Sequence, residues 1–277
     1  MIYTLNVERF RPRGLSDRIS SIFSPCRLSA RIKKHHHISV LQLRYTAMRG
    51  KIRFGMIYPY LKGSSGVVLC DESTDLSGSR LTRFESDDFS AVMMTSFLRA
   101  ALKDNPNKSG LRCAYYDPMG KRPEIAEQLL EFLPELTVVT EMPKYYEIFA
   151  DSLMDEKGLS LTVSNDPQLL AERQLIVTSC AIDCELPISS VSLVFSPSKP
   201  LVPCRFTLLW DYHVEAPYKF MRLRPDGLDE MYFLSALYSL GNAKELENLI
   251  PDRAGTGQDV FTKERVLHRL LPRRRTA

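Results

Sequence analysis

The chain has 277 residues, of which 44% are hydrophobic and 25% are charged, which is the composition of an ordinary globular protein. This length accommodates one large domain or two small ones. No run approaches the roughly 20 apolar residues of a membrane-spanning helix. The first residues also lack the apolar segment and cleavage site of a secretory signal. We therefore expect a cytoplasmic protein.

The net charge of +4 is distributed unevenly along the chain. Residues 1–65 carry a net charge of +11, residues 66–262 carry −12 and residues 263–277 carry +5. We therefore expect a basic N-terminal arm (1–65), an α/β body (66–252) and a basic C-terminal tail (253–277). Basic segments of this kind indicate contact with nucleic acid or with an acidic protein partner, here through residues 1–65 and 263–277, or basic termini that fold onto the acidic body.

In the arm, residues 3–7 alternate like a short strand, and residues 15–23 fit one amphipathic helix. Residues 38–60 mix aromatic and basic side chains without a clear period. They are compatible with a helical arm that packs its aromatic residues on the body, or with a surface that combines phosphate contacts with base stacking. The tract of residues 33–37, KKHHH, predicts a solvated turn, because adjacent histidines do not share a face.

The body alternates between strand and helix. Residues 111–141 change from a period of two to 3.6 and back, which predicts a strand, a loop, a helix and a second strand. A helix is expected before this unit at 89–103 and another after it from Pro143. Further strands are predicted at 159–163, 175–179 and 191–195, with a short helix at 168–172. This order predicts a doubly wound, mostly parallel sheet.

Beyond the body sheet, residues 205–215 alternate cleanly and predict one further strand. Its polar face carries Asp211, His213 and Glu215. A histidine between carboxylates can exchange a proton, so these three are weak catalytic candidates, although a solvated edge strand has the same pattern. Two helices are expected at 229–240 and 243–250, then a linker at 252–259 and a basic amphipathic tail. No complete catalytic motif is present.

The loop of residues 118–123 follows the first body strand, where open α/β sheets bind ligands. A dinucleotide fingerprint, G-x-G-x-x-G, has three glycines, whereas this loop has only Gly120. Met119 precedes that glycine, and Lys121 and Arg122 after it offer side chains for a phosphate beside the helix start. Glu141 lies 21 residues beyond Gly120, close to the spacing of the acidic residue that binds a ribose. An ordinary polar loop and a carboxylate preceding a helix are the alternatives.

The segments LRCAYYDPMG, LTVVTEMP, SLTVSNDPQLL and AERQLIVTSC resemble the NAD(P)-binding Rossmann domains of the shikimate dehydrogenase and glutamyl-tRNA reductase group. The resemblance covers residues 111–197. It implies a Rossmann-like α/β fold with NAD or NADP as cofactor. It also implies that Gly120, Thr140, Glu141, Thr178 and Ser179 face that cofactor. Two of the three glycines and the catalytic Lys/Asp pair of those dehydrogenases are missing. Both a cofactor-binding core and a bacterial Rossmann-like core that has lost its cofactor are compatible with this pattern.

Six cysteines are spread through the chain without the spacing of a disulfide framework, so we expect reduced thiols. Cys180 and Cys184 lack a second pair of ligands nearby, and no metal site is expected. Two functional hypotheses follow. The first is a protein that binds NAD(P) or another nucleotide at residues 118–123, an oxidoreductase if it is an enzyme. The second is a non-enzymatic scaffold whose basic arm and tail bind nucleic acid or an acidic protein.

Overall fold

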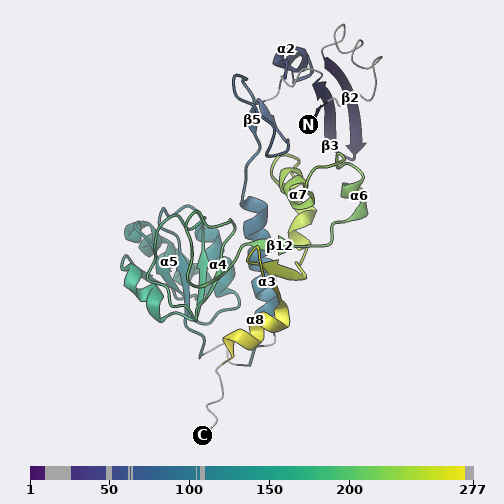
Figure 1. Ribbon diagram of the computed structural model, residues 1–277. Helices are drawn as coiled ribbons and strands as arrows, with labels where there is room; N and C mark the ends of the chain where they lie inside the picture. Colours follow the sequence, from purple (N-terminus) through teal and green to yellow (C-terminus); the bar gives the residue numbers. More distant parts are fainter. Residues whose placement is uncertain are drawn as a thin grey trace. The chain divides into compact units, whose positions relative to one another are not determined.

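A computed structural model describes residues 1–9, 26–47, 52–61, 63, 65–103, 105–106 and 110–271 (Figure 1). The chain forms two compact units, the first from residues 1–86 and 216–246 and the second from residues 87–215 and 247–277. The predicted boundaries after residues 65 and 252 fall inside the first and the second unit, respectively. The division into a basic arm, an α/β body and a basic tail therefore stays a prediction.

The second unit contains a six-stranded sheet in which every pair of neighbouring strands is parallel. Its spatial order is β8-β7-β6-β9-β10-β11. Numbered along the chain from the first of them, the strands follow the order 3-2-1-4-5-6 of the Rossmann fold. The strands are β6 (Cys113–Tyr116), β7 (Thr137–Val139), β8 (Thr162–Ser164), β9 (Leu175–Thr178), β10 (Leu193–Phe195) and β11 (Thr207–Leu209). The predicted doubly wound α/β sheet is therefore confirmed.

The central strands are apolar on both faces, as expected for a sheet covered on both sides. All residues of β7, β9 and β10 are buried. The helices between residues 87 and 175 are α3 (Asp88–Leu102), α4 (Pro123–Leu130), α5 (Pro143–Lys157) and the 3-10 helix η3 (Pro167–Glu172), as far as the structure describes this range. Both α4 and α5 begin with a proline, whose fixed φ suits the first helical position. Helix α5 ends at Gly158, which adopts the left-handed conformation with φ of 66°.

One prediction for the second unit was wrong. Residues 205–215 do not form a single strand, because the chain changes partners near Trp210. Strand β11 completes the parallel sheet, whereas β12 (Asp211–His213) pairs with β13 (Arg253–Gly255) in an antiparallel sheet of order β12-β13-β14. Strand β14 is Val260–Thr262, and it leads into helix α8 (Lys263–Leu270). The predicted linker at 252–259 therefore contains a strand. A period of two continues through a change of partner, so alternation alone does not reveal it.

The first unit is built on a three-stranded sheet of order β1-β3-β2. Strand β1 (Ile2–Arg9) is parallel to β3 (Ile38–Ala47), and β2 (Cys26–His35) forms an antiparallel hairpin with β3. The expectation of a helical arm across residues 38–47 was therefore wrong. The central strand β3 buries side chains on both faces, which removes the clean alternation of a half-exposed strand. The helix predicted at 15–23 lies outside the described residues.

The remaining elements of this unit are short, apart from one helix. They are α2 (Phe54–Ile57), the 3-10 helix η1 (Tyr58–Leu61), β4 (Val67–Val68), β5 (Thr82–Arg83), α6 (Tyr218–Met221), α7 (Glu230–Ser239) and the 3-10 helix η4 (Lys244–Asn248). The turn of the β2–β3 hairpin falls on His36 and His37, whereas residues 33–35 of the predicted solvated turn belong to β2. Among the helices of the described residues, none is long and apolar enough to cross a membrane.

Candidate functional site

The order of the parallel sheet reverses between β6 and β9, which are neighbours although two strands separate them in the sequence. At such a point the loops after the two strands leave toward opposite faces and open a crevice at the carboxyl ends. The loop after β6 contains the predicted residues 118–123. The end of β7 carries Thr140 and Glu141, and the end of β9 carries Thr178 and Ser179.

The centre of this region is Asp117, a residue that the sequence analysis did not select. Its side chain has no exposed surface, and its carboxylate accepts four hydrogen bonds. The backbone N–H groups of Lys121 and Arg122 donate over 3.2 and 3.0 Å, the Ser179 hydroxyl over 2.8 Å and the Tyr146 hydroxyl over 2.7 Å. Asp117 therefore connects β6 to its own loop, to the end of β9 and to helix α5.

Two buried tyrosines support the loop after β6. The Tyr146 hydroxyl donates to Asp117, and the Tyr115 hydroxyl donates to the carbonyl oxygen of Arg122 over 2.8 Å. Burial is the main cause that raises the pKa of Tyr115 and of Tyr146 above the ordinary value. For Tyr146 the hydrogen bond to the Asp117 carboxylate raises the pKa further. Both hydroxyls consequently keep their protons at neutral pH and act as donors.

Gly120 has a φ of 62°, in the left-handed region where a glycine avoids strain. A Cβ atom at this position would lie 3.3 Å from Cβ of Met142 and 3.4 Å from the ring of Tyr145. The glycine therefore lets the loop approach the start of α5 closely. Met119, Met142 and Tyr145 are each about half exposed, at 58%, 50% and 46%, so an apolar surface remains around the glycine.

The two basic residues of the loop have different surroundings. The Arg122 guanidinium lies largely buried and forms ion pairs with Asp87 and Asp88, the latter over 2.9 Å. It is therefore already neutralised within the protein. The Lys121 side chain is exposed, and its ammonium group has no ion-pair partner within the described part of the chain. Only Lys121 of the two offers a free positive charge at the crevice.

The predicted residues at the ends of β7 and β9 divide into buried and exposed groups. Thr140 is buried and accepts the N–H of Met142 at 3.0 Å, and the buried Thr178 hydroxyl donates to the Cys180 carbonyl over 2.9 Å. The side chain of Glu141 is exposed, while its N–H donates to the Pro118 carbonyl over 3.0 Å. This bond places the exposed carboxylate next to the loop after β6.

Tyr116 is the last residue of β6 and lies near the ionisable side chains of Cys184 and Glu141. Burial raises the pKa of Tyr116 to about 12, and the neighbouring Cys184 and Glu141 add to the effect. The phenol therefore stays neutral at physiological pH and is available as a hydrogen-bond donor beside Glu141.

The backbone of the loop does not fit a pyrophosphate in the manner of a glycine-rich loop. In that arrangement, free backbone N–H groups point at the phosphates. Here the N–H groups of Lys121 and Arg122 point at the Asp117 carboxylate. At the outer side of this edge, Glu141 is an exposed hydrogen-bond acceptor beside the half-exposed side chains of Met142 and Tyr145, and these are the groups that could hold a nucleoside.

The weak catalytic candidates lie on the other sheet of this unit. The structure places Nε2 of His213 3.1 Å from Oδ2 of Asp211, both on β12 and each a little over one third exposed. Glu215 is exposed and follows the end of the strand. The predicted proximity is thus found for Asp211 and His213, whereas no contact to Glu215 is recorded among the described residues. Their catalytic role stays a prediction.

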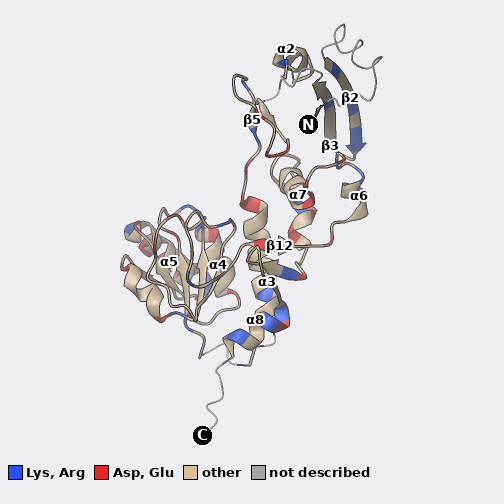
Figure 2. Ribbon diagram, viewed as in Figure 1, with Lys and Arg blue, Asp and Glu red and all other residues tan. Residues whose placement is uncertain are grey.

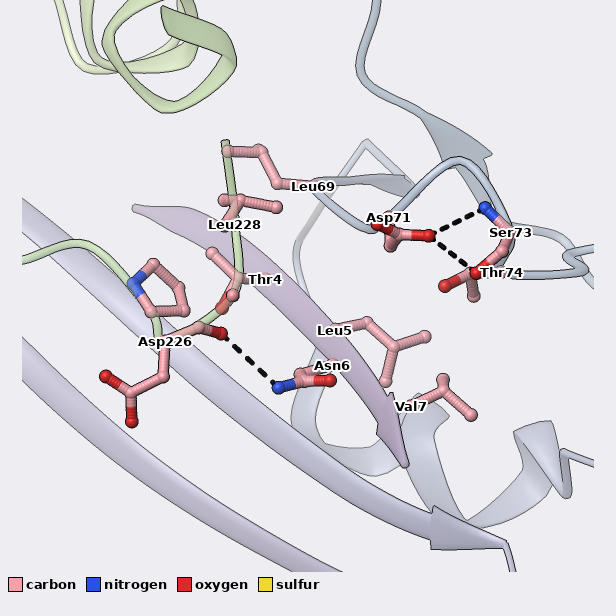
Figure 3. A pocket seen from close by; sticks show the side chains of 12 residues that line it. Thr4, Leu5, Asn6, Val7, Leu69, Asp71, Ser73, Thr74, Asp226 and Leu228 are labelled. Carbon is pink, nitrogen blue, oxygen red and sulfur yellow. Dashed lines mark hydrogen bonds between the residues drawn. The ribbon is translucent and has the colours of Figure 1, made fainter. Parts of the chain in front are cut away.

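A hollow of about 320 Å³ lies in the first unit, between residues 4–7 of β1, the turn after β4 and residues 225–228 (Figure 3). The Asp71 carboxylate accepts the backbone N–H of Ser73 over 2.8 Å, and the Asn6 amide donates to the Asp226 carbonyl over 3.5 Å. The ionisable side chains that line it are the carboxylates of Asp71 and Asp226. This charge disfavours a phosphate, so we do not place a nucleotide there.

A second hollow, of about 580 Å³, lies in the other unit over helix α8. Arg265, His268 and Arg269 line it together with Val191 and Phe261, and the Arg265 guanidinium lies 4.0 Å from the centre of the Phe261 ring. Figure 2 shows the Lys and Arg positions of α8 in blue. The predicted basic amphipathic tail is therefore a helix up to Leu270, and residues 272–277 lie outside the described residues.

The second unit is thus a Rossmann-like α/β domain, defined by its parallel strands and by the reversal of their order between β6 and β9. No protein-family model matches the chain, and no curated protein matches it. Nineteen chains of solved structures do match. Those described next are 10% to 15% identical to this chain.

Three of these structures illustrate the likeness. Quinate dehydrogenase from Corynebacterium glutamicum, in complex with NAD, is 11% identical over 91% of this chain and 95% of its own, with a TM-score of 0.35. L-tryptophan dehydrogenase from Nostoc punctiforme is 10% identical over 88% and 76%, with a TM-score of 0.33. The iminosuccinate reductase of Paracoccus denitrificans, in complex with NAD+, is 15% identical over 45% and 41%, with a TM-score of 0.30. The chain covers only about two fifths of that reductase and of CmnK.

Proposed function

We propose that this chain binds an adenine nucleotide, either NAD(P) or a related nucleotide, at the carboxyl edge of its parallel sheet. The observation that carries the proposal is the position of Glu141. Its exposed carboxylate follows the second strand of a sheet with order 3-2-1-4-5-6, and its backbone is hydrogen-bonded to the loop after the first strand. In this fold an acidic residue at that position accepts hydrogen bonds from ribose hydroxyls.

The surroundings of Glu141 support a nucleoside. Met142 and Tyr145 present half-exposed apolar side chains next to the carboxylate, and a purine ring packs favourably on such groups. The neutral Tyr116 phenol adds a polar group close to Glu141. A base and a sugar therefore find apolar contact and a hydrogen-bond acceptor side by side.

The phosphate of the nucleotide is assigned to the side chain of Lys121. An ammonium group without an ion-pair partner in the described chain attracts a phosphate as a point charge. Arg122 is not assigned this role, because Asp87 and Asp88 already neutralise it. When bound, NAD or NADP would supply hydride-transfer chemistry. The residues of this edge bind and orient the adenosine half of the ligand.

A thermal-unfolding titration with AMP, ADP, NAD and NADP tests the proposal, because a ligand that binds the folded state raises the melting temperature by mass action. We expect a saturable rise for the wild-type protein and a dissociation constant weakened about tenfold in Glu141→Gln, the loss of one charged hydrogen bond. Glu172→Gln, a change at the exposed last residue of η3, is the matched control and should leave binding unchanged. No rise with any of the four nucleotides would refute the proposal.

A second function, binding of nucleic acid, is favoured by strand β2. Arg27, Arg31, Lys33 and Lys34 lie on this edge strand, and residues 26–47 contain no acidic residue (Figure 2). Arg27 and Arg31 share one face of the strand, four residues apart, so their side chains project in the same direction. Regularly placed cations with exposed side chains suit a polyanion.

Salt-dependent binding of a fluorescent oligonucleotide tests this second function. Each phosphate contact contributes nearly one unit to the slope of log affinity against log salt for duplex DNA. Arg27→Ala/Arg31→Ala should therefore lower the slope by about two units. The basic C-terminal segment is tested in the same way with Arg265→Ala/Arg269→Ala. Unchanged slopes in both double variants would exclude binding through these segments, and an acidic protein would then be the remaining partner class to test.

A further inference from the structure

We propose that Asp117 is a resident anion of this Rossmann-like domain: its carboxylate takes the backbone donors that a dinucleotide pyrophosphate would need. The inference deepens the proposed function. Its consequence for nucleotide preference rests on that function, whereas the arrangement of the loop around Asp117 does not. The site should prefer nucleotides by their adenosine half and bind their phosphates with side chains only.

The geometry of the loop after β6 shows that its backbone donors are already bonded to Asp117. Three successive backbone N–H groups donate to the same residue: that of Gly120 to the Asp117 carbonyl over 3.2 Å, that of Lys121 to Oδ1 over 3.2 Å and that of Arg122 to Oδ2 over 3.0 Å. The positive φ of Gly120 allows the chain to curl around the carboxylate in this way. Two of the three donors are thus taken by the Asp117 side chain and the third by its backbone carbonyl, so none of these bonds is left for a ligand.

The environment of the Asp117 carboxylate also supports its role as the resident anion. Burying an ionised carboxylate is costly unless charge-assisted hydrogen bonds compensate for the lost water. Asp117 obtains two such bonds from the loop, one from Ser179 at the end of β9 and one from Tyr146 of α5. The loop leads directly into α4, whose N-terminus favours a negative charge nearby. Donors on the loop, at the end of β9 and on α5 therefore fix the carboxylate together.

A bound phosphate would compete with the Asp117 carboxylate for the N–H groups of the loop. A phosphate that bound the same N–H groups would have to displace a carboxylate tethered beside them, which has a high effective concentration. If the carboxylate stayed, the two negative charges would repel each other in a buried environment of low dielectric. A pyrophosphate is therefore kept away from the backbone of this loop, and a ligand's phosphates remain near the exposed Lys121.

The direct test replaces the carboxylate. In Asp117→Gly, formate and inorganic phosphate should fill the vacated position and raise the melting temperature in a saturable manner. The wild-type protein and the control Asp183→Gly, a change at an exposed aspartate, should show no saturable rise with either anion. Asp117→Asn, which keeps the shape of the side chain and removes its charge, should respond less than Asp117→Gly. A folded Asp117→Gly without any anion-dependent shift would overturn the proposal.

A second measurement needs no variant. In the wild-type protein without nucleotide, the amide protons of Lys121 and Arg122 should exchange at least ~100-fold more slowly than in an unstructured chain, because both are hydrogen-bonded to a buried carboxylate. Exchange at the unstructured rate would overturn the proposal even if Asp117→Gly failed to fold.

The two proposals can fail separately. Anion rescue and slow amide exchange do not involve a nucleotide, so they can hold when the proposed function fails. If nucleotides do bind, the dissociation constants of AMP and NAD for the wild-type protein should lie within a few-fold of each other. NAD binding more than about a hundredfold tighter than AMP would contradict the inference and leave the proposed function intact.

Discussion

The Ser179 hydroxyl lies 2.8 Å from Oδ1 of Asp117 and joins the end of β9 to the end of β6, where the order of the parallel sheet reverses. In a nucleotide-binding Rossmann domain this is the mouth of the ligand crevice. In the present chain a hydrogen bond between two buried side chains crosses it. Side chains therefore bridge the carboxyl ends of β6 and β9, while Glu141 and Lys121 at the same edge are exposed.

Removing a donor from Asp117 should destabilise the protein. Ser179→Ala and Tyr146→Phe each delete one hydrogen bond to a buried carboxylate, so we expect a loss of about 1.5–3 kcal/mol in the free energy of unfolding for each. Chemical denaturation measures this loss. Ser152→Ala, which removes an exposed hydroxyl on α5 bonded to a carbonyl of its own helix, is the control and should change stability by less than about 0.5 kcal/mol.

The losses of stability in Ser179→Ala and Tyr146→Phe should also be coupled. Because both hydroxyls serve the same carboxylate, the double variant should lose an amount that differs from the sum of the single losses by roughly 0.5 kcal/mol or more. Strict additivity in a double-mutant cycle would mean that the carboxylate does not link β9 to α5.

Gly120 should tolerate no side chain. In Gly120→Ala the positive φ costs roughly 1–2 kcal/mol, and the contact with Met142 adds to it. The matched control is Gly110→Ala, where a Cβ meets nothing within 4 Å and no positive φ is present. Thermal unfolding of the two variants distinguishes them. Equal stability of both would show that the loop does not lie against the start of α5.

The histidine tract should behave as part of a hairpin. His36 has a φ of 49° in the turn between β2 and β3, where glycine is better accommodated than a residue with a Cβ atom. His36→Gly should therefore keep the free energy of unfolding or raise it by up to about 1 kcal/mol. His36→Val should lower it, because a β-branched residue is strained at this φ. A destabilising His36→Gly would contradict the turn.

The cysteines should differ in their reactivity toward a thiol reagent. Of the six, Cys184 alone is exposed, whereas burial raises the pKa of the Cys113 thiol to about 12 and also raises that of Cys70. The thiolate is the reactive form, and a pKa of about 12 leaves only about one thiol in ten thousand deprotonated at pH 8. Cys184 should be labelled first in the native protein, and Cys113 and Cys70 only after unfolding. Mass spectrometry of labelled peptides measures the order.

The sequence predicted the second unit better than the first. The β6-α4-β7 segment changes its apolar period twice within thirty residues, and prolines mark the starts of α4 and α5, so the parallel sheet could be predicted from local patterns. The switch from β11 to β12 could not, because alternation continues while the pairing partner changes from β10 to β13. In the first unit the alternation of residues 3–7 predicted β1, whereas β3 was missed because it is buried on both faces, and its hairpin partner β2 was missed with it.

The sequence predicted that the loop after β6 lies near Glu141, but it did not predict the contacts of Asp117. Residues 118–122 and Glu141 do meet at the carboxyl edge, as the βαβ unit requires. The role of Asp117 depends on Tyr146 and Ser179, which lie 29 and 62 residues away in the sequence and meet it only in the folded chain. One local signal was present: an aspartate directly follows the apolar strand β6, at the start of the loop.

One measurement tests the account most directly: the backbone amide resonances of the wild-type protein, followed by NMR while AMP and then NAD are added. The account predicts progressive shifts at Glu141, Met142 and Tyr145, with the amide of Arg122 unmoved because it stays bonded to Asp117. Large shifts at Lys121 and Arg122 with the release of that bond, or no shifts along this edge with either nucleotide, would contradict it.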